Sequence, residues 1–223
     1  KAMTGSDGST WNAGAATAAF TTWAGQLSTQ IDLAISNNDG MAKGFTSSTS
    51  WSQINCPIFG YDANEDVLKD IKDGKFTGTI TQNVDAQAAG VLQVIRNLCD
   101  GLSFADSIKK GFSEADQYGN KISASMTYND ATKALLASNT AVTKDNIESY
   151  YSASGIQRDS GIKKVPDTAK QLNIWLDYYN GTDTFLSTSY KPALNYYANL
   201  LNIKVNTKEG DGQSEDSVAN AFN

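Results

Sequence analysis

The stretch that decides the fold is CPIFGYDANEDVLKDIKDGKFTGTITQNVDAQAAGVLQVIRNLCDG, residues 56–101. Two short runs rich in β-branched and aromatic residues, at 57–61 and 77–82, alternate in it with helical patterns at 65–72 and 85–99. In the second helical pattern apolar residues recur at spacings of three and four, and Gly101 follows as a stop signal. This alternation predicts βαβ units that build a parallel sheet flanked by helices.

The same alternation extends on both sides of this stretch. Residues 152–171, SASGIQRDSGIKKVPDTAKQ, show no sustained period and are the best linker candidate. The sequence therefore predicts an α/β domain at 1–151, a linker at 152–171 and a further segment at 172–223. The remaining predicted elements are strands at Ile31–Ser36, Lys121–Thr127, Leu172–Tyr178 and Ile203–Thr207, and helices at Asn12–Leu27, Thr184–Leu201 and Ser214–Phe222.

Composition excludes several classes of protein. The 223 residues contain no His, which removes Ser-His-Asp and Cys-His catalysis and imidazole metal sites. Eighteen Lys and Arg against 24 Asp and Glu give a formal net charge of −6, and the acidic residues are scattered. This charge argues against nucleic acid as a partner. No cofactor and no metal site are expected.

The two cysteines and the apolar runs indicate neither a disulfide framework nor a membrane span. Cys56 and Cys99 lie in unrelated contexts, which favours two separate thiols; a bridge formed in an oxidising compartment is the alternative. No run approaches the roughly 18 apolar residues of a membrane span. Lys1 does not begin a signal peptide, so the chain is either cytosolic or has an export signal outside the sequence shown.

Polar side chains follow the predicted strands. In open α/β sheets the ligand crevice lies outside the carboxyl ends of the strands. Carboxylates supply acceptors and side-chain amides supply both donors and acceptors, which suits the adjacent hydroxyls of a polyol. Flat aromatic rings suit the apolar faces of a sugar. The residues placed in this way are Asn38, Asp62, Gln82 and Asp183, with Trp11 and Phe185 as the aromatic side chains.

Each of these residues also has a structural interpretation. Asn38 with Asp39 can form a helix N-cap, and Asp62 can cap the helix that contains Glu65. Phe185 at a helix start can be a hydrophobic staple. Two other tryptophans, Trp23 and Trp175, are expected in the core. The functional interpretation rests on the joint position of the six residues, which capping does not predict.

The residues also carry a resemblance. AISNNDGMAKG at 34–44 followed by residues 56–101 resembles the carboxyl-terminal lobe of the type I periplasmic sugar-binding proteins, most closely the galactose/glucose-binding branch. The resemblance covers roughly residues 3–150 and implies that Trp11 stacks on the sugar while Asn38, Asp62 and Gln82 bind its hydroxyls. Gln82 departs from the galactose-type pattern, which has Asn there, and is similar to the ribose-type pattern.

A second, weaker resemblance concerns LNIWLDYYNGTDTFLSTSYKPALNYYANLLNIKVNTKEGDGQSEDSVANAF, residues 172–222. It is similar to the start of the amino-terminal lobe of the same family, in which an Asp and a Phe before the first helix touch the sugar. Asp183 and Phe185 fit these positions. Here the segment follows the carboxyl-lobe segment, and on the order of a hundred residues of a two-lobed pattern of two domains of about 150 are missing.

The resemblance implies a non-enzymatic sugar receptor of an ABC-type uptake system, exported and lipid-anchored, with galactose or glucose as ligand. A membrane permease is the expected partner. A half-built parallel sheet also predicts self-association or a complementing polypeptide. The alternatives are a sugar-processing enzyme that uses Asp62 and Asp183 as an acid/base pair, and the ligand-sensing core of a transcriptional regulator.

Overall fold

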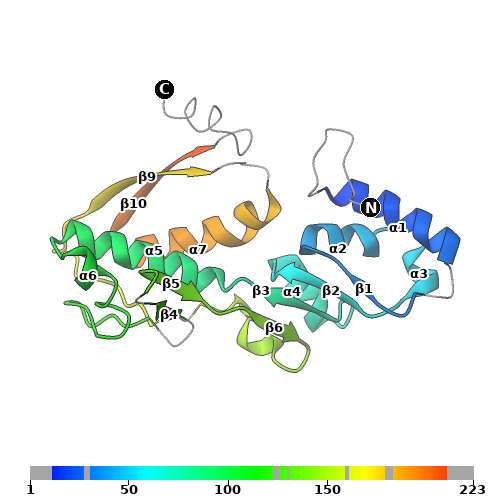
Figure 1. Ribbon diagram of the computed structural model, residues 1–223, viewed down its shortest axis with the longest axis horizontal. Coiled ribbons are helices and arrows are strands. Elements are labelled where there is room, and N and C mark those ends of the chain that lie inside the picture. The colour runs from blue at the N-terminus through cyan, green and yellow to red at the C-terminus, as the bar shows by residue number, and fades with distance from the viewer. Residues whose placement is uncertain are drawn as a thin grey trace. The chain divides into compact units, whose positions relative to one another are not determined.

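The computed structural model describes residues 12–27, 31–122, 126–129, 131–158, 161–178 and 183–209. Its contacts divide the chain into two compact units, each made of two stretches of sequence. Unit 1 comprises Lys1–Gln82 and Asn139–Gln157, and unit 2 comprises Asn83–Ser138 and Arg158–Asn223. Figure 1 labels the helices and strands of both units. None of the described helices is both long enough and apolar enough to cross a bilayer.

Unit 1 is built on a four-stranded mixed sheet in the order β1-β2-β3-β6. The first three strands run parallel, with Ala34 opposite Ile58 and Phe59 opposite Gly78. Strand β6 closes the other edge of β3 in antiparallel orientation. The strands are β1 (Ala34–Ile35), β2 (Ile58–Asp62), β3 (Gly78–Thr81) and β6 (Thr140–Thr143), and a small hairpin adds β7 (Tyr151–Ser152) and β8 (Gly155–Ile156).

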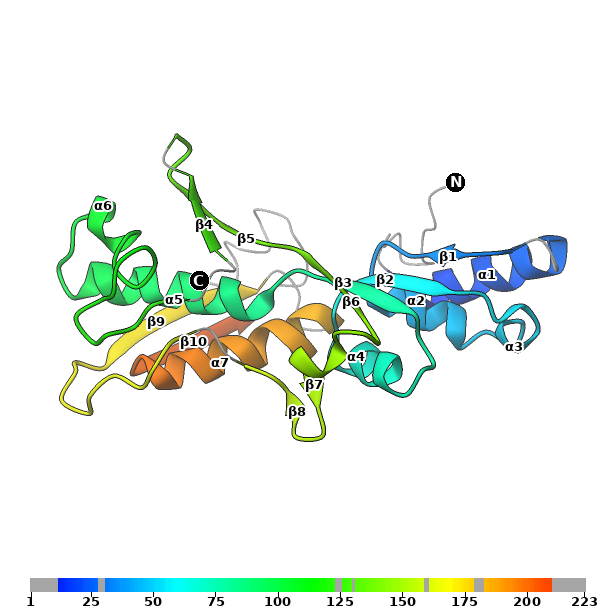
Figure 2. The ribbon, with the colours of Figure 1, turned by 90° about the horizontal axis from the view of Figure 1, so that it is seen from below.

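The helices of unit 1 bury apolar side chains against this sheet. Val67, Leu68 and Ile71 of α4 share one helix face and belong to one core cluster with Ile58 of β2 and Val142 of β6. Helix α2 contributes to the same cluster, and Figure 2 shows α2 and α4 alongside these strands. The helices are α1 (Ala13–Leu27), α2 (Asp39–Thr46), α3 (Trp51–Ile54), α4 (Glu65–Lys72) and the 3₁₀ turn η1 (Ile147–Ser149).

The opposite face of this sheet is less well covered. Ile35 is 70% exposed, and Phe59, Tyr61 and Ile80, which share its face through the strand pairing, are only partly buried. Parallel strands normally have both faces covered by other elements. Unit 1 therefore presents an apolar sheet face that the described residues do not fully bury.

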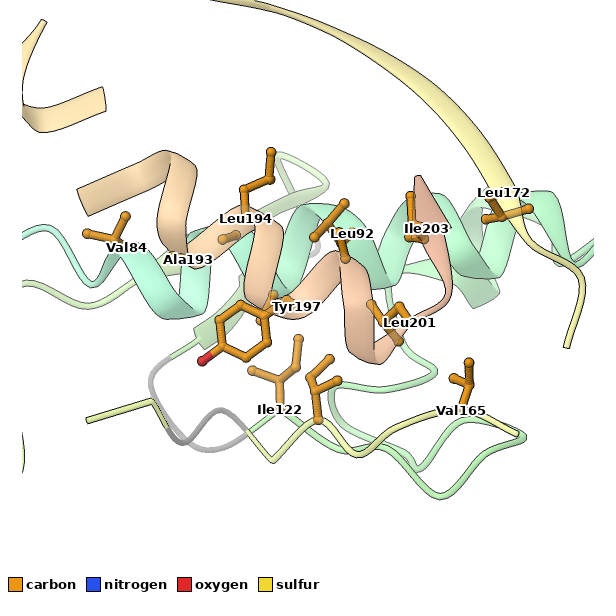
Figure 3. Packing of buried hydrophobic residues seen from close by; sticks show 14 of the residues in the cluster. Val84, Leu92, Ile122, Val165, Leu172, Ala193, Leu194, Tyr197, Leu201 and Ile203 are labelled. Atoms are coloured by element: carbon orange, nitrogen blue, oxygen red, sulfur yellow. The ribbon is translucent and has the colours of Figure 1, made fainter. Parts of the chain in front are cut away.

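Unit 2 packs two helices against a parallel pair of strands. Leu92 of α5, Leu194 and Tyr197 of α7, and Ile122 belong to one buried cluster, part of which is drawn in Figure 3. Leu172 and Ile203, which face each other at the start of the two strands, extend this core. The elements are α5 (Val84–Cys99), α6 (Phe104–Ser107), the hairpin β4 (Met126–Asn129) and β5 (Ala134–Ala137), β9 (Leu172–Tyr178), the π-helical turn η2 (Leu186–Tyr190), α7 (Lys191–Leu200) and β10 (Ile203–Glu209).

Most predicted elements are confirmed, with small changes at their ends. Helix 65–72 and strand 172–178 have the predicted bounds, and the helix predicted at 12–27 begins one residue later. Strand β1 is shorter than the predicted Ile31–Ser36. The helix predicted at 184–201 contains the π-helical turn at its start. The predicted helix Ser214–Phe222 lies outside the described residues.

The strand predicted at Lys121–Thr127 is wrong as a member of the parallel sheet. Lys121 and Ile122 are not in a strand, and β4 begins at Met126 and pairs antiparallel with β5. The Asn129 side chain accepts hydrogen bonds from the backbone N–H groups of Ala131 and Thr132. Such a local turn favours pairing between sequence neighbours. The edge of β3 is taken by β6 instead.

Two further expectations concern the linker and the tryptophans. Within 152–171, Ser152–Ile156 includes strands of the β7–β8 hairpin, while Ile162 and Val165 are buried in the core of unit 2. The domain boundaries derived from the sequence stay a prediction. The expectation that Trp175 is in the core is wrong, because it is 62% exposed on β9, and Trp23 is also exposed.

The two faces of the sheet give a stability prediction. Ile58 is 1% exposed in the core of unit 1, so Ile58→Ala should lower the free energy of unfolding by about 2–5 kcal/mol. Ile35→Ala removes the same atoms from the exposed face and should cost less than about 1 kcal/mol. Urea unfolding followed by circular dichroism measures both. Equal losses would mean that the Ile35 face is covered in solution.

Candidate ligand-binding site

The structure brings three of the predicted site residues of unit 1 to one edge of the sheet. Because β1, β2 and β3 are parallel, their carboxyl ends lie at the same edge. Asn38 follows β1 and caps α2, Asp62 is the last residue of β2, and Gln82 follows β3. Three residues that are far apart in the sequence therefore lie at the same edge of the sheet.

Asp62 and Gln82 are in direct contact. The side-chain Nε2 of Gln82 donates a hydrogen bond of 2.6 Å to Asp62 Oδ1. Asp62 is only 6% exposed and Gln82 is partly buried, so this pair sits at the margin between core and solvent. A carboxylate beside an amide offers acceptors and donors within one small area. This is the combination that neighbouring hydroxyl groups need.

Asn38 has the capping role that the structural interpretation predicts. Its Oδ1 accepts a hydrogen bond of 2.8 Å from the backbone N–H of Met41, in the first turn of α2. The side-chain NH₂ of Asn38 donates to no described residue. Capping thus uses the acceptor and leaves the donor for another group, so the capping and binding roles of Asn38 are compatible.

The capping interpretation of Asp62 is wrong. The N-cap of α4 is Asn64, and Asp62 contacts Gln82 across the strand ends instead. Asp62 and Ala63 have φ angles of 121° and 59°, in the left-handed region that non-glycine residues rarely adopt. Such strain costs of order 1–3 kcal/mol per residue and persists only where neighbouring contacts fix it. The turn that carries Asp62 is therefore held in place by its surroundings.

A buried carboxyl that sequence reasoning did not select lies beneath this turn. Asp39, the first residue of α2, is 0% exposed. Its Oδ2 accepts from the backbone N–H of Asn64 and its Oδ1 accepts from the Thr79 hydroxyl, both at 2.8 Å. A Cβ at position 60 would overlap Asp39 Oδ1, so β2 needs Gly60 there. Glycine inside a strand was the available sequence signal for this close approach.

Burial raises the pKa of Asp39 to about 7. The hydrogen bonds from Asn64 and Thr79 oppose this shift, while the neighbouring carboxylates of Asp62 and Asp66 add to it. Asp39 therefore changes its charge near neutral pH, and it does so beside Asp62, the central residue of the candidate site.

The predicted residues of unit 2 have local roles at the start of a helical segment. Asp183 Oδ1 accepts a hydrogen bond of 2.9 Å from the backbone N–H of Leu186. Phe185 is partly buried against the core of unit 2 and lies 6.4 Å from the Tyr190 ring, between centroids. Phe185 has the helical φ and ψ of −62° and −46°, so it lies within the helical segment and is not the residue before an N-cap that a hydrophobic staple requires. Their contact with a sugar stays a prediction, and Trp11 lies outside the described residues.

A separate hollow of about 310 Å³ occurs in unit 2, between α5 and the segment that follows α6. No residue predicted from the sequence as a ligand contact lines it. Its lining residues are Asn97, Leu102, Lys110, Ala115, Asp116 and Gln117. The size of this hollow alone does not identify it as a binding site, and the strand-end residues of unit 1 remain the better candidate.

Comparison with known proteins relates this fold to a family. Residues 2–103 and residues 171–223 each match a family described as periplasmic binding protein domain. The D-galactose/methyl-galactoside binding periplasmic protein MglB of Haemophilus influenzae is 34% identical over 100 residues, which cover 44% of this chain and 30% of that protein. The predicted resemblance to type I periplasmic sugar-binding proteins is confirmed: the chain is related to this family over part of the family's length.

Solved structures give weaker similarities. A solute-binding protein of an ABC transporter from Bacillus halodurans with bound myo-inositol is 20% identical, with a TM-score of 0.43. The match covers 62% of this chain and 39% of that protein. A carbohydrate transporter solute-binding protein from Chloroflexus aurantiacus in complex with D-glucose is 21% identical, with a TM-score of 0.42. The match covers 65% of this chain and 42% of that protein. The chain spans less than half of either structure and less than a third of the MglB relative.

The pKa of Asp39 predicts how stability depends on pH. Its value of about 7 in the folded chain exceeds the ordinary value of 3.8, so the folded state binds the extra proton between these values. The contribution of Asp39 to the free energy of unfolding is therefore greatest below pH 3.8. It decreases by roughly 4 kcal/mol as the pH rises to about 7. Asp39→Asn cannot titrate and should lack this slope. Urea unfolding at pH 4 to 8 compares the two, and identical slopes would contradict the assignment.

Proposed function

We propose that the chain supplies a ligand-binding edge of an extracytoplasmic sugar receptor of an ABC-type uptake system. The observation that carries this proposal is the buried Asp62 carboxylate, which accepts a hydrogen bond from Gln82 at the same sheet edge as Asn38. The ligand is a monosaccharide such as galactose or glucose. The MglB relative, whose name gives D-galactose and methyl-galactoside as ligands, supports this class of ligand.

Binding in this proposal needs no chemical step. Asp62 accepts from sugar hydroxyls, the free side-chain NH₂ of Asn38 donates to a hydroxyl oxygen, and Gln82 fixes the Asp62 carboxylate while meeting a further hydroxyl. The sequence prediction that Trp11, Asp183 and Phe185 also contact the sugar is kept as part of this proposal. Specificity arises because a sugar that lacks one of these hydroxyls leaves a buried polar group unpaired, at about 1–3 kcal/mol.

The partners and location follow from the same proposal. We expect a membrane permease to receive the sugar-loaded form, and an extracytoplasmic location with a lipid anchor. The word periplasmic in the name of the MglB relative and in the matched family description supports the location. The exposed apolar face around Ile35 supports a complementing polypeptide segment, because a parallel sheet of a two-lobed receptor needs a second covering layer.

The enzyme alternative gains no support from the contacts of the two carboxylates. Asp183 accepts from the Leu186 N–H at the start of a helix, and Asp62 accepts from Gln82. A glycoside hydrolase instead needs one of the pair to be a protonated acid at the scissile bond. Incubation with galactose or glucose distinguishes the two functions, because a receptor leaves the sugar unchanged while an enzyme converts it over time.

Substitution of Asp62 gives the prediction for binding. Isothermal titration of the chain with D-galactose and D-glucose should show saturable binding of at least one of them. Asp62→Asn keeps the shape but removes the charge, so it should weaken binding by about 1.5–3 kcal/mol, or at least tenfold in Kd.

Asp145→Asn is the matched control for this experiment. Asp145 is exposed in the loop after β6, and antiparallel pairing of Thr143 with Gly78 puts this loop at the other edge of the sheet. Its Kd should equal that of the parent chain. Sugar binding that is equally strong in the parent, Asp62→Asn and Asp145→Asn chains would place the binding site elsewhere.

A further inference from the structure

Asp39 connects three elements of unit 1 through a single carboxyl group. It begins α2, it accepts from the Asn64 N–H just after β2, and it accepts from the Thr79 hydroxyl of β3. The same Thr79 hydroxyl accepts a hydrogen bond of 3.3 Å from the Ala63 N–H. Both backbone N–H groups that follow Asp62 are therefore bound by Asp39 or by its partner.

These hydrogen bonds act on the strained part of the site. Asp62 and Ala63 are the two consecutive residues with positive φ, and Ala63 and Asn64 supply the N–H groups that are held. Strained backbone persists where surrounding contacts over-determine it. We propose that Asp39 is a positioning residue of the candidate sugar site, which sets the turn at residues 62–64 and thereby aims the Asp62 carboxylate at the ligand. This inference rests on the proposed function for its effect on sugar.

The charge of Asp39 adds a pH dependence to this role. The ionisable groups that face it are Asp62 at the end of β2 and Asp66 on α4. On its own helix, Lys43 pairs with Asp70 and lies 3.8 Å from Asp66. Helix α1, which packs against α2, and strand β3 contain no ionisable side chain. The negative charges next to Asp39 thus come from Asp62 and Asp66.

Ionised Asp39 places a second negative charge beside Asp62. A bound sugar removes water from Asp62, which makes this repulsion stronger. Since the pKa of Asp39 is about 7, sugar affinity should fall as pH rises through neutrality. We expect the Kd to rise about three- to tenfold between pH 6 and pH 8.5, corresponding to a further rise of the Asp39 pKa when sugar binds.

Two substitutions of Asp39 separate positioning from charge. Asp39→Asn reproduces the hydrogen bonds of the neutral acid, since its oxygen accepts from Asn64 N–H while its NH₂ donates to Thr79 Oγ1. This variant should bind sugar within about threefold of the parent at pH 6, with no pH dependence. Asp39→Ala removes the acceptor that holds the Asn64 N–H and the Thr79 hydroxyl, and it should weaken binding at least about tenfold at pH 6.

Thr79 provides a matched pair that leaves Asp39 in place. Thr79→Val keeps the side-chain shape but removes the hydroxyl that holds both Asp39 and the Ala63 N–H, whereas Thr79→Ser retains it. Thr79→Val should weaken sugar binding about as much as Asp39→Ala, and Thr79→Ser should remain close to the parent. This pair keeps the inference testable if Asp39→Ala does not fold.

The experiment measures two quantities on the 223-residue chain and its variants. Hydrogen exchange followed by NMR gives the protection factors of the Ala63 and Asn64 amides, without any ligand. Titration with D-galactose and D-glucose at pH 6 to 8.5 gives Kd. Loss of amide protection in Asp39→Ala and Thr79→Val, together with weaker binding and a flat pH profile in Asp39→Asn, is the expected result.

The outcomes separate this inference from the proposed function. Unchanged protection in both Asp39→Ala and Thr79→Val overturns the inference, whatever the chain binds. Lost protection with an unchanged Kd also overturns it, because the turn would then not position the ligand. If the parent binds neither sugar at any pH, the proposed function is wrong, and the protection factors alone decide whether Asp39 sets the turn.

Discussion

Parallel pairing of β1, β2 and β3 is the constraint on which the candidate site depends. It gathers the carboxyl ends of the three strands at one edge, and each end carries a side chain that can bind a hydroxyl: Asn38, Asp62 and Gln82. An antiparallel arrangement would send neighbouring strand ends to opposite edges. The helices that pack on this sheet stabilise it, and polar side chains from distant parts of the sequence are thereby held at one edge.

The cost of this arrangement is concentrated at Asp62 and Asp39. A carboxylate that is 6% exposed and a carboxyl that is fully buried lie close together, and the backbone of Asp62 is strained. In a protein selected only for stability, apolar side chains would be expected at such positions. Their presence is consistent with a ligand site, since strain and buried polar groups tend to occur where function requires them.

Sequence reasoning predicted the elements better than their partners. The alternation in residues 56–101 determines local structure, so α4, α5, β2 and β3 appear as expected. The hairpin at β4 and β5 was missed because strand pairing depends on contacts that no local pattern shows. For the site, strand ends were visible as polar residues, but Asp39 was taken only as part of a cap. Its role depends on its burial and on the space that Gly60 leaves for its carboxyl group, and both are properties of the tertiary structure. Asp183 and Phe185 belong to unit 2 and the other described site residues belong to unit 1, so contact of all six residues with one sugar stays a prediction.

A crystal structure of the chain with D-galactose or D-glucose is the most direct test of the account. It predicts sugar hydroxyl oxygens within hydrogen-bond distance, about 2.6–3.2 Å, of both the Asp62 carboxylate and the Asn38 side-chain nitrogen. A sugar bound elsewhere, for example in the hollow beside Asn97 and Asp116, with Asp62 and Asn38 facing only protein or solvent, would contradict the central claim.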